Sequence, residues 1–86
     1  RKQQYDQAQI HYMGALALDS CFVDARNNLG SLYFLQKQWT KAEAQYTAAI
    51  ACQPNEAQLF FNRANTWYEL REYYNALKDA ERYVLH

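Results

Sequence analysis

Apolar side chains recur along this chain at the spacing of an α-helix. Within residues 5–18, Ala8, Tyr12, Ala15 and Leu16 follow one another at steps of four, three and one, which puts them on one face of a helix. The same periodicity returns along the rest of the chain, interrupted each time by only a few residues. The sequence therefore predicts an all-α fold without strands. The five predicted helices cover about residues 5–18, 23–36, 39–52, 56–70 and 72–86.

Short segments separate these helices. Asp19–Cys21 offers turn and N-cap residues, so the chain is expected to reverse there. Lys37–Gln38 is too short for anything except an antiparallel return. Pro54 cannot continue a helix, and Asn55 is able to cap the next one. Consecutive helices are thus expected to lie side by side in opposite directions.

The same residue types return after a step of 34 residues. Small residues return as small and aromatic residues mostly as aromatic. The matched sets are Tyr33 with Trp67, Trp39 with Tyr5 and Tyr73, and Ala42 with Ala8 and Ala76. A fixed period of this length is typical of repeat architectures. The chain is therefore interpreted as one domain with a partial repeat at 1–22, a full repeat at 23–56 and a near-complete repeat at 57–86.

The repeat register also bears on details inside the helices. Thr40 and Glu43 have the spacing of a capping box, but the register starts that helix nearer Gln38, and we follow the register. Gly30 stands inside a predicted helix, where glycine costs about 1 kcal/mol against alanine. A neighbouring helix is therefore expected to approach closely there. In the last helix we expect a buried face made of Ala76, Leu77, Ala80, Tyr83 and Val84.

The full repeat carries Leu29-Gly30-x2-Tyr33, Ala42-x3-Tyr46 and Pro54. This pattern resembles the tetratricopeptide repeats, and in register the resemblance covers essentially the whole chain. It departs from the family pattern at Ser20, Arg26 and Arg63, so these three residues are expected to make other contacts than the family residues do. The resemblance implies a right-handed α-solenoid fragment in which the first helix of each repeat lines a concave groove. In such proteins the groove holds an extended peptide or a partner helix.

Mapped by this register, the predicted groove carries amide, aromatic and acidic side chains. Its residues are Asp24, Asn27, Asn28, Ser31, Phe34, Gln58, Phe61, Asn62, Asn65, Tyr68 and Glu69. Asn28 and Asn62 are one period apart, so they are candidates for a ladder that pairs with a peptide backbone; the alternative is that both are merely solvated. Phe34, Phe61 and Tyr68 either form apolar pockets for ligand side chains or complete the core.

The resemblance also raises a second way of binding, the clamping of a C-terminal carboxylate by cations of the groove. Asn62 matches one clamp position, but Asn27 stands where the family has lysine. That mode is not expected here. Arg63 is expected to pair with a neighbouring acid or to extend its stem across the helix surface.

Composition narrows the class of partner. Lys plus Arg and Asp plus Glu are nine each, so no net field favours nucleic acid or an anionic bilayer. No apolar run reaches the ~18 residues that span a membrane, and no signal-type apolar block follows the N-terminus. Because the chain opens partway through a repeat, we expect it to be excised from a longer protein. A cytoplasmic location is expected, although a targeting signal could lie outside this segment.

Cys21 and Cys52 are the two cysteines. Two cysteines do not make the dense framework of small secreted domains, so we expect reduced, packing thiols, with a disulfide between them as the alternative.

The chain offers little for catalysis. His11 and His86 stand without a nucleophile motif, a phosphate loop or metal-ligand spacing, so we expect neither an enzyme nor a cofactor. The expected function is a protein-interaction module. One alternative is a homodimer joined through exposed terminal helix faces, with Ala8, Tyr12 and Ala15 at one end and Ala80 and Tyr83 at the other. Another is a regulatory appendage of an enzyme whose catalytic domain lies outside this stretch.

Overall fold

The computed structural model describes residues 2–85, and for Lys2 it describes the backbone only. Its helices are α1 (Lys2–Leu18), α2 (Val23–Leu35), α3 (Trp39–Cys52), α4 (Ala57–Glu69) and α5 (Tyr73–Leu85). This range contains no strand, and the helix bounds agree with the predicted ones to within three residues. His86, at the end of the last predicted helix, lies outside the described residues. The all-α prediction is confirmed.

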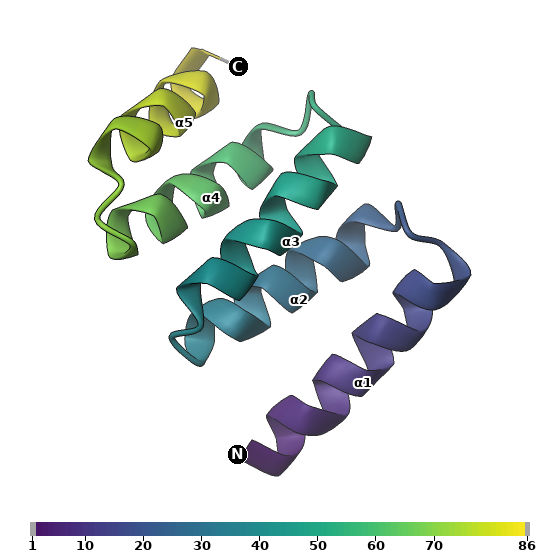
Figure 1. The fold of residues 1–86 in the computed structure, drawn as a ribbon. Helices are drawn as coiled ribbons and strands as arrows, with labels where there is room; N and C mark the ends of the chain where they lie inside the picture. The colour runs from purple at the N-terminus through teal and green to yellow at the C-terminus, as the bar shows by residue number, and fades with distance from the viewer. Residues whose placement is uncertain (1, 86) are drawn as a thin grey trace.

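Each helix packs against the helices next to it in the sequence, and α2 also contacts α4. Figure 1 shows the resulting row of antiparallel helices, with the N-terminus and the C-terminus at its two ends. The molecule measures 35 × 24 × 14 Å along its principal axes. Such a row is stabilised by contacts between neighbours rather than by one central core. No helix within residues 2–85 is long and apolar enough to cross a lipid bilayer.

The two hairpin turns are copies of each other. After α2, the Lys37 N–H donates to Phe34 O and the Gln38 N–H to Tyr33 O, at 3.0 and 2.9 Å. After α4, residues 71 and 72 repeat these bonds to residues 68 and 67, at 3.0 and 2.9 Å. Lys37 and Arg71 both adopt left-handed φ values, 61° and 63°. This is the Schellman ending of a helix, and its recurrence after one period confirms that both turns reverse the chain alike.

The N-termini of the helices confirm one prediction and show that two others are wrong. Helix α3 begins at Trp39 with Gln38 as N-cap, as the repeat register predicts. The predicted side-chain caps of α2 and α4 are wrong, because Phe22 and Glu56 occupy the N-cap positions without a side-chain hydrogen bond. The Asp19 carboxylate instead accepts the Cys21 N–H at 3.1 Å and closes the turn. The Asp19 carboxylate oxygen therefore bonds within the turn and does not cap α2.

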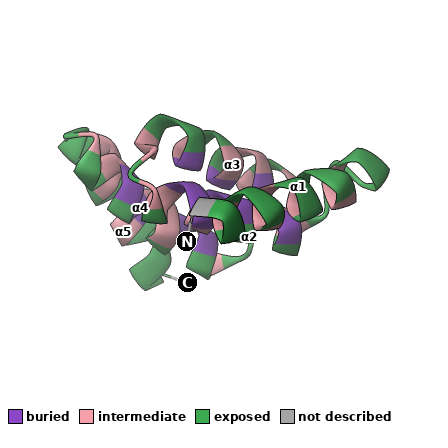
Figure 2. Ribbon diagram, turned by 90° about the horizontal axis from the view of Figure 1, so that it is seen from below, coloured by how far each residue is buried: buried purple, intermediate pink, exposed green. Residues whose placement is uncertain are grey.

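Most of the buried residues lie on α2 and α3 (Figure 2). Leu29, Leu32, Tyr33, Ala42 and Tyr46 form a buried cluster on these two helices. Tyr5, Ala8, Tyr12 and Leu16 of α1 pack against this cluster from one side. Ala8 and Tyr12 are thus engaged within the chain, which corrects their assignment to a self-association surface.

Gly30 of α2 lies in close contact with Tyr46 of α3. A Cβ built on Gly30 would stand 2.7 Å from Cε1 of the Tyr46 ring, closer than van der Waals contact allows. The predicted close approach is confirmed. Only glycine leaves room for this ring.

We expect Gly30→Ala to lower the free energy of unfolding by up to about 2 kcal/mol. The clash with Tyr46 costs roughly 1–3 kcal/mol, and alanine recovers up to about 1 kcal/mol of helix propensity. Gly14→Ala is the matched control, because Gly14 is exposed in α1 and a Cβ there meets nothing within 4 Å. Urea unfolding should show the control to be slightly stabilised. Equal shifts in both variants would contradict the close approach.

The predicted buried face of α5 is wrong. Leu77 and Val84 are 59% and 76% exposed, Tyr83 is also exposed, and Ala76 and Ala80 are only half-buried. The reason is that α5 contacts α4 alone among the described helices. The buried residue of α5 is instead Asp79, on the side that faces α4.

The prediction of reduced thiols is also wrong, because Cys21 and Cys52 form a disulfide with a Cα–Cα distance of 5.7 Å. That distance lies within the usual range for a disulfide. The bond joins the turn before α2 to the last residue of α3. Antiparallel packing of α2 and α3 brings these two points together, although they lie 31 residues apart in the sequence.

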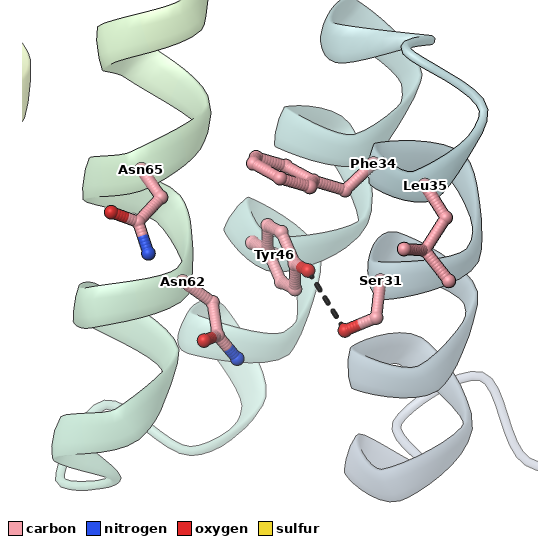
Figure 3. A pocket seen from close by; sticks show the side chains of 6 residues that line it. All are labelled: Ser31, Phe34, Leu35, Tyr46, Asn62 and Asn65. Atoms are coloured by element: carbon pink, nitrogen blue, oxygen red, sulfur yellow. Dashed lines mark hydrogen bonds between the residues drawn. The ribbon is translucent and has the colours of Figure 1, made fainter.

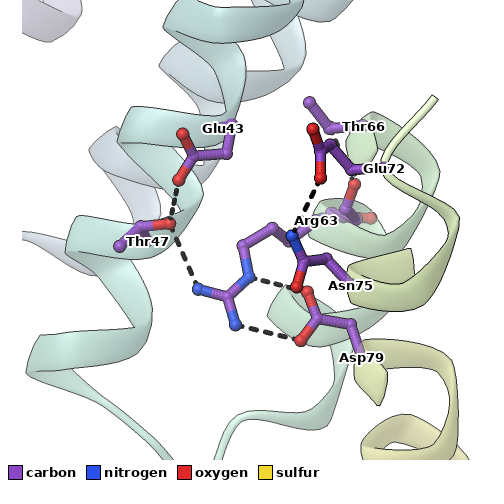
Figure 4. A network of polar contacts seen from close by, with 8 residues as sticks. Glu43, Thr47, Arg63, Thr66, Glu72, Asn75 and Asp79 are labelled. Carbon is purple, nitrogen blue, oxygen red and sulfur yellow. Dashed lines mark hydrogen bonds and ion pairs between the residues drawn. The ribbon is translucent and has the colours of Figure 1, made fainter. Parts of the chain in front are cut away.

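Arg63 links three helices (Figure 4). Its Nε and one Nη donate to the two Asp79 carboxylate oxygens of α5, at 2.7 and 2.9 Å. The other Nη donates to the Thr47 hydroxyl of α3 at 3.1 Å, and that hydroxyl donates in turn to the Glu43 carboxylate. The predicted pairing of Arg63 with a neighbouring acid is confirmed.

Candidate functional site

A hollow lies between α2 and α4, with α3 beneath it (Figure 3). We call it the central hollow, and its volume is about 240 Å³. It is lined by Ser31, Phe34, Leu35, Tyr46, Asn62 and Asn65. Four of these six residues belong to the predicted groove: Ser31, Phe34, Asn62 and Asn65. Helices α2 and α4 therefore face each other across this hollow.

Tyr46 closes the floor of the central hollow. Its hydroxyl lies 3.0 Å from Ser31 Oγ in a hydrogen bond, and its ring is buried. Burial raises the pKa of the Tyr46 phenol, and the Ser31 hydrogen bond offsets this only in part. The phenol is therefore neutral at physiological pH and holds α2 and α3 together. Tyr46 also lines the central hollow.

Three predicted amides meet at one edge of this surface. Asn62 Nδ2 donates to Asn27 Oδ1 across the gap from α4 to α2 at 2.8 Å. Asn62 Oδ1 accepts a hydrogen bond from Gln58 Nε2 at 3.2 Å. Asn62 is thus bonded to Asn27 and not to Asn28, which is exposed. Each primary amide still has a free N–H or lone pair, so this chain of amides retains capacity for a ligand.

The predicted aromatic residues divide between two places. Phe34 lines the central hollow and also packs edge-on against Trp39, with ring centroids 4.9 Å apart. Phe61 packs against Tyr83 at 4.9 Å, and Tyr68 against Tyr73 at 5.5 Å. Phe61 and Tyr68 lie outside the central hollow.

Phe61 and Tyr68 line a second hollow of about 380 Å³ between α4 and α5, which we call the C-terminal hollow. Its lining is Phe61, Ala64, Asn65, Tyr68, Tyr73, Ala76, Leu77 and Ala80. Asn65 belongs to both hollows, so they lie on the two sides of one ridge of α4. Together they form one surface with two apolar depressions.

Neither hollow is lined by a charged residue. Asp24 and Glu69, both predicted for the groove, are exposed and line neither of them. The Arg63 guanidinium of α4 is bound to Asp79, and Arg63 lines neither hollow. The surface therefore presents amide and hydroxyl groups beside apolar walls, without a cation for an anionic ligand.

Sequence reasoning missed Leu35 and Tyr46 of the central hollow. Leu35 lies four residues after Ser31, which is on the same helix face, so that spacing was a signal for it. Tyr46 carried no such signal, because the repeat pattern assigns it to the core. Only the geometry shows that a core side chain also forms the floor of an open site.

The region described, residues 2–85, holds no cluster of three or more His, Cys, Asp and Glu side chains placed to bind a metal ion. The arrangement offers hydrogen-bonding amides next to aromatic and aliphatic surface. Such surfaces recognise polypeptide backbone together with apolar side chains.

Comparison with known proteins agrees with the repeat. The family model that describes the tetratricopeptide repeat matches residues 23–56. No curated protein matches the chain.

Three solved structures share the fold. The first TPR of Spaghetti (RPAP3), bound to the HSP90 peptide SRMEEVD, is 25% identical with a TM-score of 0.90, over 96% of this chain and 66% of that one. The second TPR of Spaghetti (RPAP3), bound to the same peptide, is 23% identical with a TM-score of 0.91, over 98% and 78%. MamA of AMB-1 is 18% identical with a TM-score of 0.86, over 94% and 48%. This chain thus spans about two thirds of the first of these structures.

Proposed function

Residues 23–56 are a tetratricopeptide repeat and the helices on either side continue its fold, so we propose that this protein is a non-catalytic module that binds a polypeptide along α2 and α4. The observation that carries the proposal is the open hollow between these two helices, with amides at its edge and aromatic side chains in its walls. Tetratricopeptide repeats are typically interaction modules, and the two Spaghetti domains hold a peptide.

The chemistry of the surface supports a different kind of peptide from the one in those domains. The peptide SRMEEVD ends in Glu-Glu-Val-Asp, so three of its last four side chains are acidic. An acidic peptide needs cations opposite it, because a desolvated carboxylate without a partner is costly. The hollows described here are lined by neutral residues, with Asp24 and Glu69 exposed beyond them. A neutral or basic peptide therefore fits this chain better than an acidic one.

The test uses one change at the hollow and the same change away from it. Leu35 lines the central hollow and is 65% exposed, and Leu18 at the end of α1 is 92% exposed. Peptides selected from a random library by binding to the wild type should bind Leu35→Glu at least about tenfold more weakly, equal to ~1.4 kcal/mol. The loss is expected because the new carboxylate replaces an apolar wall and must be desolvated against apolar side chains of the ligand.

Leu18→Glu should bind those peptides like the wild type. Circular dichroism should show unchanged helicity for both variants, since neither leucine belongs to the core. Peptides that bind all three proteins equally would show that the central hollow is not the site.

Self-association is a second candidate, and the exposed face of α5 favours it. Leu77, Val84 and Leu85 form an apolar surface on that helix, next to Ala80. A second copy could cover this surface, as apolar patches often mark protein contacts. Light scattering over a concentration series separates the two candidates. A protein that remains monomeric at micromolar concentration excludes the second.

The disulfide bears on where such a module works. Disulfides persist in oxidising compartments and are rare in the cytosol. The Cys21–Cys52 bond therefore favours an extracytoplasmic setting over the cytoplasmic one expected from the sequence. Trapping of thiols in cells, followed by mass measurement, would decide the redox state.

A further inference from the structure

The two hairpins of this chain can be compared residue by residue, because they are related by a step of 34 residues. In the α2–α3 hairpin, the Tyr46 ring lies over Gly30 and its hydroxyl is bonded to Ser31 Oγ at 3.0 Å. One period later, Ala80 stands in place of Tyr46, Ala64 in place of Gly30, and Asn65 in place of Ser31. The α4–α5 hairpin therefore lacks the aromatic ring that fills the α2–α3 hairpin.

The missing ring leaves space. Ala64, Asn65 and Ala80 all line the C-terminal hollow, whose volume is about 380 Å³. These three positions are equivalent to Gly30, Ser31 and Tyr46. In the preceding repeat, Tyr46 supplies the ring and the other two residues contact it. We propose that the C-terminal hollow binds a tyrosine side chain of a basic partner peptide, in the place that Tyr46 occupies one repeat earlier.

The walls of the hollow suit an aromatic anchor. Phe61, Tyr68 and Tyr73 supply ring surfaces, and Leu77 supplies aliphatic surface. Tyr68 is 61% exposed and Phe61 is 40% exposed, so these rings are open to a ligand. Aromatic side chains that enter such pockets contribute much of the binding energy at protein interfaces.

Asn65 gives the hollow a preference for tyrosine over phenylalanine. Its side chain stands where Ser31 stands in the preceding repeat, and Ser31 is the partner of the Tyr46 hydroxyl. Asn65 is exposed, and an amide can donate to a phenol oxygen or accept from a phenol hydroxyl. A phenol in the position of the missing ring therefore finds a hydrogen-bond partner.

The charges near the hollow favour basic residues beside the tyrosine. Glu81 is exposed on α5 and lines a shallow depression that shares Leu77 and Ala80 with the C-terminal hollow. The basic residues of α5 are directed to other rings: Lys78 lies over Tyr74, and Arg82 over Phe60. A basic residue of the ligand can therefore pair with the Glu81 carboxylate. An acidic residue would have to compete with the rings that Lys78 and Arg82 contact.

This inference rests on the proposed function, since it places one part of the same peptide. Asn65 is shared by the two hollows, so a chain that lies in the central hollow can continue over the α4 ridge into the C-terminal one.

The probes are three short peptides that differ at one residue: acetyl-Lys-Gly-Tyr-Gly-Lys-amide and its versions with phenylalanine or alanine in place of tyrosine. Binding is followed by NMR titration of the protein amides. The tyrosine peptide should bind at least about tenfold more tightly than the alanine peptide, with the largest shifts at Ala64, Asn65 and Ala80. The phenylalanine peptide should lie between them. Equal affinity of the tyrosine and alanine peptides would overturn the inference.

A second experiment fills the hollow from within. The double variant Ala64→Gly with Ala80→Tyr rebuilds the packing of Gly30 and Tyr46 in the next hairpin. It should fold, show a higher melting temperature and lose its preference for the tyrosine peptide. Asn65→Ala should keep the binding of the phenylalanine peptide and lose the advantage of tyrosine over it. A double variant that folds and still prefers the tyrosine peptide would place the ring elsewhere.

These outcomes are separate from the test of the central hollow. Leu35 does not line the C-terminal hollow, so Leu35→Glu should bind the short tyrosine peptide like the wild type. One outcome is that the library peptides bind Leu35→Glu more weakly than the wild type but bind the double variant Ala64→Gly with Ala80→Tyr equally well. In that case this inference fails and the proposed function stands. If the hollow is instead filled by a second copy, light scattering will show a dimer that the double variant abolishes, which overturns the peptide assignment.

Discussion

Removal of the Cys21–Cys52 disulfide is expected to lower the free energy of unfolding by about 3–4 kcal/mol. The bond closes a loop with a sequence separation of 31 residues, and the chain-entropy model assigns such a loop roughly that much stabilisation. A domain of this size has a total stability of only about 4–13 kcal/mol. The disulfide is therefore expected to supply a large share of the stability of the fold.

The measurement compares the wild type with Cys21→Ser combined with Cys52→Ser, by urea and thermal unfolding. A loss of this size should lower the melting temperature by roughly 12–32 °C, given 4–8 °C per kcal/mol for a domain of 60–100 residues. Wild type treated with a reductant should match the double variant, because Cys21 lies in an exposed turn. A melting temperature that is the same with and without reductant would show that the bond does not stabilise the fold.

Truncation of Asp79 is expected to have the second-largest effect, a loss of about 2–3 kcal/mol. The Asp79 side chain is only 8% exposed and is held by two hydrogen bonds from Arg63, which is 19% exposed. Removing one partner of a buried pair costs about 3–5 kcal/mol, because the other charge is left unpaired. Partial exposure of Arg63 and its bond to Thr47 reduce that cost here.

Asp79→Ala should be compared with Glu81→Ala by urea unfolding. Glu81 is an exposed acid on the same helix, and its removal should change stability by no more than about 0.5 kcal/mol. The combined variant Arg63→Met with Asp79→Leu should recover part of the loss, since no buried charge is then left alone. Equal effects of Asp79→Ala and Glu81→Ala would show that the ion pair contributes only as a surface charge.

The sequence already contained much of the candidate site, because one helix face follows from spacing alone. Ser31, Phe34, Asn62 and Asn65 were predicted for the groove and do line the central hollow. The pairing of Asn62 with Asn27 was not predictable, since it depends on the offset between α2 and α4 and not on the period. A repeat fixes which positions are equivalent but not which of them meet.

The linear pattern by itself determined the all-α architecture, the bounds of its helices to within a few residues, and the close approach at Gly30. These follow from local rules: the helical period, the inability of proline to continue a helix, and the small residue required at a helix contact. Packing in three dimensions decided the Cys21–Cys52 bond, the exposure of Leu77 and Val84, and the two hollows. Each of these depends on which of the described helices lie beside one another, and the spacing of residues along one helix does not determine that.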